Sequence, residues 1–233
     1  MQTLRQGGDA IGVGCALNNL AVLYGIEGEA DRSHPLILAA LTAFQHTAQQ
    51  AEEAVVHYNG GELMVAEHPD LAFAYWRRAS AIWTALGDFE GEAIAFRAMG
   101  DAHHHLGRPF HALSCYQEAV ELQRSIGNWA AEAAVLEQVA EVYQEEGMPL
   151  SAIDQLHRSL AVFQFIGDRV AADRLLCRLG KLYESLDELA AAMECYQQVL
   201  ESPTNRASAP PLQATPRVDL SNVLFHPNCP IAS

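Results

Sequence analysis

The core-facing positions of residues 89–128 recur at the spacing of two amphipathic helices. In the first half they fall at i, i+3, i+6, i+7 and i+10, so that they form one stripe: Ala93, Phe96, Met99, Gly100 and His103. The second half has a similar stripe: Ala112, Tyr116, Ala119 and Val120. Between the stripes lie Gly107, typical of a helix end, and Pro109, typical of a first helical turn. The segment is therefore predicted to form an antiparallel helix pair.

This pattern returns every 40 residues along the chain. Pro69, Pro109 and Pro149 are spaced at this interval, and so are four alanines, Ala72, Ala112, Ala152 and Ala192. Self-similarity at a fixed period indicates that one helix pair is stacked repeatedly. We therefore expect an all-α solenoid of five helix pairs, in units 9–48, 49–88, 89–128, 129–168 and 169–202.

The overlaid units share a sequence signature. The first helices contain a large residue, then Leu or Val followed by Gly or Ala, then Tyr: Leu136, Val139, Ala140, Tyr143 and Leu176, Leu179, Gly180, Tyr183. This signature resembles the tetratricopeptide repeat, in its long-repeat class of about 40 residues per unit, over roughly residues 9–202. Unit two departs from it at Asn59 and Glu67. The resemblance implies a right-handed α-solenoid, a superhelix whose first helices line a concave groove.

The two ends of the chain depart from the repeat. Gly8-Asp9 lies 79 residues before Gly87-Asp88, so residues 1–8 are expected to be a helix stub, the last turn of a second helix. Residues 203–233 contain six prolines and are expected to form a disordered tail. An apolar cluster lies within this tail, between Val218 and Phe225. One hypothesis is that this cluster folds back onto the groove and competes with a partner.

Composition restricts the classes of partner. The chain has 233 residues, a formal net charge of −15 and 50% apolar residues. Nucleic acids and anionic membrane surfaces attract basic proteins, so neither is an expected partner. The five cysteines form no C-x-x-C pair and are interpreted as reduced thiols, which favours a cytoplasmic location. No apolar run has the length of a membrane-spanning helix.

Candidate chemistry is sparse. His103, His104 and His105 are consecutive, and consecutive helical residues point in different directions, so they do not form a metal site together. No phosphate-binding or nucleophile motif is present, and Lys181 is the only lysine. We therefore expect no metal, no cofactor and no enzymatic activity.

The resemblance places a peptide-binding groove on the first helix of each unit. The positions implied to line it are Arg97, Asp101, His104, Glu137, Glu141, Gln144, Glu145, Arg174, Lys181 and Glu184. A clamp for a chaperone C-terminal carboxylate needs Lys, Arg and Asn at set groove positions, and that pattern is missing here.

Glu137, Glu141 and Glu145 follow one another at four-residue spacing on a single helix face. Two interpretations remain open at this stage. The carboxylates are neutralised by Arg97 on one side and by Arg174 or Lys181 on the other, or they form an acidic patch for a Lys or Arg of a partner peptide.

The sequence thus favours a protein-interaction adaptor or scaffold that binds a peptide in its groove, with charge setting the register. The alternative is a regulatory or self-assembly domain of a larger protein or oligomer, whose N-terminal cap a partner supplies. The oligomeric state is left open.

Overall fold

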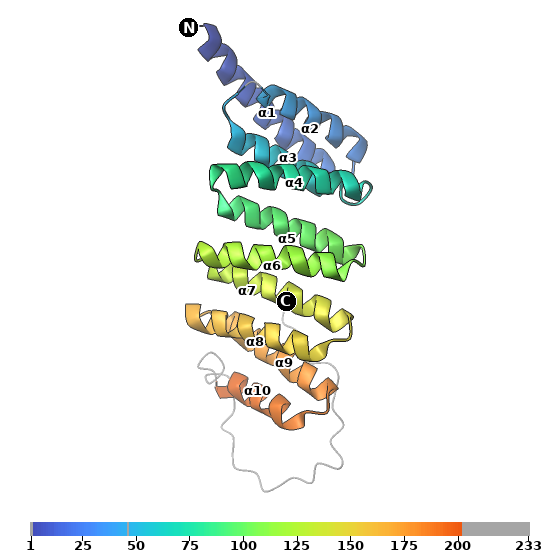
Figure 1. Cartoon of the computed structure of the whole chain (residues 1–233), viewed down its shortest axis with the longest axis vertical. Helices are drawn as coiled ribbons and strands as arrows, with labels where there is room; N and C mark the ends of the chain where they lie inside the picture. The colour runs from blue at the N-terminus through green and yellow to red at the C-terminus, as the bar shows by residue number, and fades with distance from the viewer. Residues whose placement is uncertain (1, 46, 202–233) are drawn as a thin grey trace.

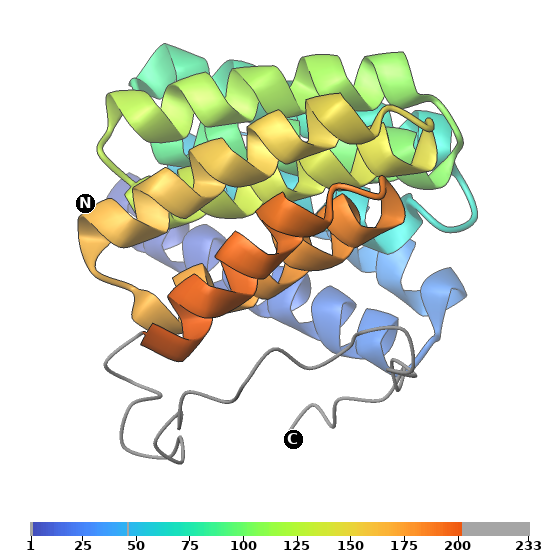
Figure 2. The same cartoon turned by 90° about the horizontal axis from the view of Figure 1, so that it is seen from below.

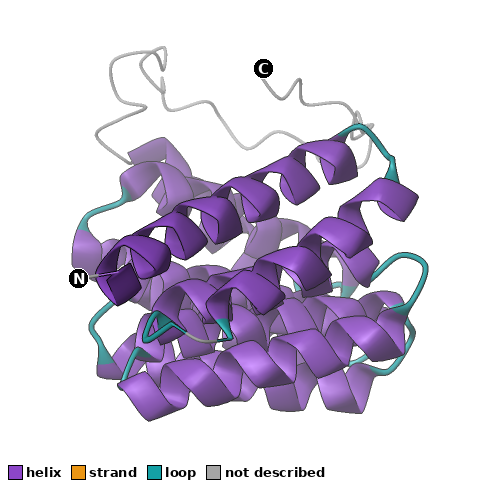
Figure 3. Ribbon diagram, turned by 90° about the horizontal axis from the view of Figure 1, so that it is seen from above, coloured by secondary structure: helices purple, strands orange, loops and turns teal. Residues whose placement is uncertain are grey.

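The computed structural model describes residues 2–45 and 47–201 and shows ten helices stacked along one axis (Figure 1). The described part contains no strand (Figure 3). The helices are α1 (Gln2–Ile26), α2 (Ala30–Phe44), α3 (Gln50–Met64), α4 (Pro69–Leu86), α5 (Phe89–His105), α6 (Pro109–Ser125), α7 (Trp129–Glu145), α8 (Pro149–Ile166), α9 (Arg169–Ser185) and α10 (Leu189–Glu201). Consecutive helices pack as pairs, α1 with α2 through α9 with α10. The protein is therefore an all-α solenoid, as its sequence predicts.

Local sequence explains where the helices begin and end. Asp88 precedes α5, and its carboxylate accepts a hydrogen bond of 3.0 Å from the Gly91 amide. Pro109 opens α6, where its missing N–H is not needed. Between these helices Gly107 has a φ of +65°, a conformation that glycine adopts without steric cost. Pro69, Pro109 and Pro149 each open a helix, so the prolines mark the repeat in space as well as in sequence.

The repeated alanines are buried within the stack of helices. Ala112 and Ala152 are 0% exposed and Ala192 is 2% exposed, which confirms that they are buried. Glycines on the opposing helix leave room for large rings: a Cβ added at Gly100 would lie 2.6 Å from the Tyr116 ring. Small residues thus admit the large rings of the second helices, and Tyr116 is only 1% exposed.

The N-terminal end differs from the expectation. Residues 2–8 do not end a preceding helix, because α1 runs without a break from Gln2 to Ile26. Glycine within a helix costs only about 1 kcal/mol relative to alanine, so Gly8 does not by itself stop one. The tail at 203–233, with its apolar cluster, lies outside the described residues. None of the described helices combines the length and apolarity needed to cross a bilayer.

Candidate functional site

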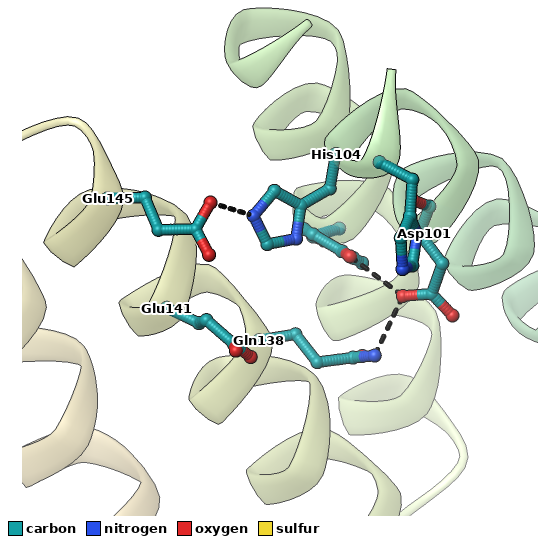
Figure 4. A pocket seen from close by; sticks show the side chains of 7 residues that line it. Asp101, His104, Gln138, Glu141 and Glu145 are labelled. Carbon is teal, nitrogen blue, oxygen red and sulfur yellow. Dashed lines mark hydrogen bonds and ion pairs between the residues drawn. The ribbon is translucent and has the colours of Figure 1, made fainter. Parts of the chain in front are cut away.

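Two clefts lie side by side along the first helices of neighbouring pairs. One has a volume of about 470 Å³ and is lined from α5, α6 and α7 by Asp101, His104, His105, Tyr116, Gln138, Glu141 and Glu145 (Figure 4). The other has a volume of about 480 Å³ and is lined from α3, α4 and α5 by Glu62, Val65, Ala66, Trp76, Ala98, Asp101, Ala102, His105 and Leu106. Asp101 and His105 line both, so the clefts adjoin. We call them the acidic cleft and the apolar cleft.

Asp101 joins three helices at the floor of the acidic cleft. Its Oδ1 accepts hydrogen bonds of 2.7 Å from the Tyr116 hydroxyl and from the Gln138 amide (Figure 4). Its Oδ2 accepts one of 3.2 Å from Arg97, one turn earlier on α5. Burial, reinforced by the Asp101 carboxylate, raises the pKa of Tyr116, so this hydroxyl stays a donor at neutral pH. Asp101 is therefore fully engaged within the fold.

The carboxylates on α7 line the opposite wall. Glu145 Oε2 lies 2.8 Å from His104 Nε2, and its side chain is 60% exposed (Figure 4). Glu141 lies one turn earlier and is exposed on the cleft. Among the described residues it has no hydrogen-bond or ion-pair partner. The acidic cleft thus presents one carboxylate paired with an imidazole and one without a direct partner.

The junction of α7 and α9 has a different charge balance. Arg174 donates a hydrogen bond of 2.7 Å to Glu137, and Arg178 lies 3.8 Å from the other oxygen of the same carboxylate. Arg178 also donates a hydrogen bond of 2.7 Å to Gln144. The Glu137 side chain is only 17% exposed. Glu137 is therefore neutralised inside the fold.

The expected groove residues divide into three groups. Asp101, His104, Glu141 and Glu145 line the acidic cleft, and Glu137, Gln144 and Arg174 meet at the next junction. Arg97 contacts Asp101 on its own helix rather than Glu137, Glu141 or Glu145. Lys181 and Glu184 lie further along α9 and line neither cleft. Burial together with Glu184 raises the pKa of Tyr196 to about 12, so this glutamate lies near α10.

Several site residues were missed from sequence. Arg178 takes the role expected of Lys181, and its four-residue spacing from Arg174 was a signal that both lie on one face. The apolar cleft lies between unit three and unit two, and unit two departs from the repeat signature. Its wall includes Trp76, whose ring occupies the space that a side chain at Gly61 would fill. Gly61 was therefore the sequence feature from which this wall of the cleft could have been predicted.

Of the three consecutive histidines, His103 is a packing residue, whereas His104 and His105 line the clefts. His103 stacks on Phe73 with ring centroids 4.2 Å apart, and burial lowers its pKa. Within the described part of the chain, no three His, Cys, Asp or Glu side chains are placed to hold a metal ion.

Comparison with known proteins agrees with this architecture. Residues 131–204 match the tetratricopeptide repeat family. No curated protein matches the chain in sequence. The matched segment is therefore of tetratricopeptide-repeat type, and solved structures with repeats of this kind share the fold of the described stack.

Three solved structures illustrate the similarity of fold. A kinesin light chain-like repeat protein of Podosopora anserina superposes with a TM-score of 0.62 at 16% identity, over 79% of this chain and 92% of that one. BtubC from P. vanneervenii gives a TM-score of 0.66 at 18% identity, over 97% and 99%. A MamA protein gives 0.58 at 16% identity, over 91% and 98%. At these identities the likeness concerns the fold alone.

Proposed function

We propose that this protein is a non-catalytic interaction scaffold that binds a peptide segment of a partner protein across the two adjoining clefts. The segment places an apolar side chain in the apolar cleft and a Lys or Arg in the acidic cleft. The observation that supports this most strongly is the shared wall, because Asp101 and His105 line both clefts and one short peptide can span them. The general role of a protein-binding scaffold agrees with the fold class.

The apolar cleft suits a side chain of moderate size. Its lining includes the aliphatic side chains of Val65, Ala98, Ala102 and Leu106. Trp76 forms part of its wall and is only 1% exposed, so this part of the wall belongs to the core. Burying an apolar side chain of the peptide there contributes about 1.5–3 kcal/mol.

The acidic cleft supplies direction and selectivity. Glu141 lacks a direct partner among the described residues, and Glu145 is exposed with only His104 beside it. A cationic side chain entering here meets carboxylates that the fold has not neutralised. The net charge of −15 also attracts basic segments at a distance. An acidic peptide is repelled at the same site, which gives the site its selectivity.

A peptide library displayed on phage tests this proposal. Selection on the wild-type protein is expected to enrich peptides with one large apolar residue and one Lys or Arg within a few positions. Selection on Glu141→Lys is expected to lose them. Glu118→Lys, the same charge change on the exposed part of α6, is the matched control and should retain them. Enrichment of acidic peptides, or equal enrichment on Glu141→Lys, would reject the proposed site.

The second candidate is the self-assembly domain, and an observation on α1 favours it. Val13, Leu20 and Leu23 are 52%, 40% and 58% exposed and lie on one face of this helix. An exposed apolar stripe of this kind is typical of a contact surface. Light scattering after size exclusion distinguishes the two candidates: a dimer that Leu20→Ser and Leu23→Ser convert to a monomer supports assembly, and a wild-type monomer excludes it.

A further inference from the structure

The last described helix has an apolar face that the stack leaves uncovered. Met193 is 56% exposed and Leu200 is 50% exposed. They are seven residues apart, so they lie on one side of α10, two turns from each other. Figure 2 shows α10 nearest the viewer at this end of the stack. We call Met193 and Leu200 the α10 face.

The equivalent positions in the earlier repeats show what normally covers such a face. The residues 40, 80 and 120 positions before Met193 and Leu200 occupy the same places on the earlier second helices. Four of the five apolar ones are buried, namely Ile153 and Leu160 at 6%, Val120 at 1% and Phe73 at 4% exposed, and the fifth, Leu113, is partly buried. In α8, Ile153 and Leu160 belong to one core cluster with Leu175, Leu176 and Leu179 of α9. Each second helix is thus covered by the next element of the stack. The α10 face has the same side-chain type without that cover.

We propose that residues 217–225 of the same chain cover the α10 face and act as the C-terminal cap of the solenoid. This segment contains the densest apolar sequence after Glu201: Val218, Leu220, Val223, Leu224 and Phe225. Leu220, Val223 and Leu224 have i, i+3, i+4 spacing in the sequence, the spacing that brings side chains together when a segment binds as a helical turn. An open solenoid end exposes apolar surface, so a cap contributes stability and solubility.

The short stretch of chain between α10 and the apolar cluster favours a contact of that cluster with α10. Sixteen residues, 202–217, separate the end of α10 from Val218. A flexible chain of this length has a root-mean-square span of roughly 22 Å. The helix α10 has 13 residues, which corresponds to a length of about 20 Å. The segment therefore reaches any point of the α10 face, and this face is nearer along the chain than the clefts on α3, α5 and α7.

Charge also favours this occupant. The helix α10 contains Glu194 and Glu201 and no basic residue. Residues 202–233 contain Arg206, Arg217 and Asp219, so that they have a small positive charge. Arg217 directly precedes the apolar cluster, where it can meet a carboxylate at the edge of the face. A second copy of α10 would instead place glutamates against glutamates.

Amide hydrogen exchange on the full chain tests the cap. The variant Leu220→Ser with Leu224→Ser removes two apolar contacts, and Leu212→Ser with Ile231→Ser is the matched control in the same tail. We expect the amides of α10 to exchange about tenfold faster in the first variant than in the wild type, and to be unchanged in the control. Equal α10 exchange in all three proteins would overturn the proposal.

A crosslink identifies the occupant. Phe225 is replaced by p-benzoylphenylalanine, which reacts on illumination with nearby C–H bonds. The expected product is a crosslink between position 225 and the peptide 189–201 within a single chain at monomer mass. A crosslink found only at dimer mass, with α10 protection that rises with protein concentration, would assign the face to a second copy. A crosslink to the clefts on α5 and α7 would assign the segment to the groove. Either result overturns the cap.

Discussion

One face of α7 contains three carboxylates of the same type that differ in their partners, because they meet different neighbouring helices. At the α7–α9 junction, Glu137 has two arginines, Arg174 and Arg178, within 4 Å. At the α5–α7 junction, Glu145 has only His104, and Glu141 has no direct partner among the described residues. One turn of helix therefore separates a carboxylate that stabilises the stack from one that is free to bind. In such an array, the cations on the neighbouring helix decide the role of each acid.

The largest expected effect concerns Asp101, beneath the acidic cleft. Asp101→Ala removes the acceptor of Tyr116 and Gln138, and Tyr116 is buried. We expect the free energy of unfolding to fall by about 2–4 kcal/mol, because a buried hydroxyl loses its partner. Urea denaturation measures this change. Asp101→Asn, which retains one carbonyl acceptor, should lose clearly less, and equal losses would contradict the role of these hydrogen bonds.

The second effect separates the two junctions directly. Glu137→Gln leaves Arg174 and Arg178 without a carboxylate, so we expect a loss of about 1–2 kcal/mol in unfolding free energy. Glu141→Gln is the matched control one turn away, with an expected change within about 0.5 kcal/mol. Thermal and urea denaturation of both variants should agree. If Glu141→Gln destabilises the fold as much as Glu137→Gln, the two junctions do not differ.

The third effect concerns binding rather than stability. For a peptide selected on the wild-type protein, Glu141→Gln together with Glu145→Gln should weaken affinity roughly tenfold and reduce its dependence on salt. Fluorescence anisotropy at several ionic strengths measures both quantities. Glu137→Gln should leave the affinity unchanged. A salt dependence that persists in the double variant would place the cation of the peptide elsewhere.

The smallest effect is expected at Lys181. This residue is exposed on α9 and lines neither cleft. Lys181→Ala should change the unfolding free energy by less than about 0.5 kcal/mol and leave peptide affinity unaltered. A larger loss of stability or of peptide affinity would show that Lys181 interacts with Glu137, Glu141 or Glu145 after all.

The sequence predicted the helices better than the contacts between them. Pro109 and Gly107 specify a helix start and a helix end through their own backbone restrictions, so these positions could be located without coordinates. Arg174 was a candidate partner of the acidic residues from the sequence, and it does pair with Glu137. The second partner of Glu137 could not be chosen, because both Arg178 and Lys181 lie on α9, near enough in sequence to be candidates. The choice between them depends on how α7 and α9 are offset along their axes. The periodicity of apolar residues shows which side of a helix is buried, but it does not determine this offset between two helices.

The apolar cleft was hidden for a related reason. One of its walls belongs to unit two, where the repeat signature is weakest, and that wall includes the Trp76 ring, which lies against Gly61. A tryptophan in a repeat position is read from sequence as core. That reading is correct for Trp76, which is 1% exposed, yet the same residue also shapes a cleft wall. At this position one residue is buried in the core and also lines a candidate binding site.

The most direct test of the proposed function is a charge-reversal cycle between Glu141 and the cation of a selected peptide. Four dissociation constants are measured, for wild type and Glu141→Lys, each with the original peptide and with its Lys or Arg replaced by Glu. The account predicts that each single reversal weakens binding and that the double reversal recovers affinity, with a coupling energy above about 1 kcal/mol. Losses that simply add would contradict the contact between Glu141 and the peptide, and with it the proposed acidic cleft.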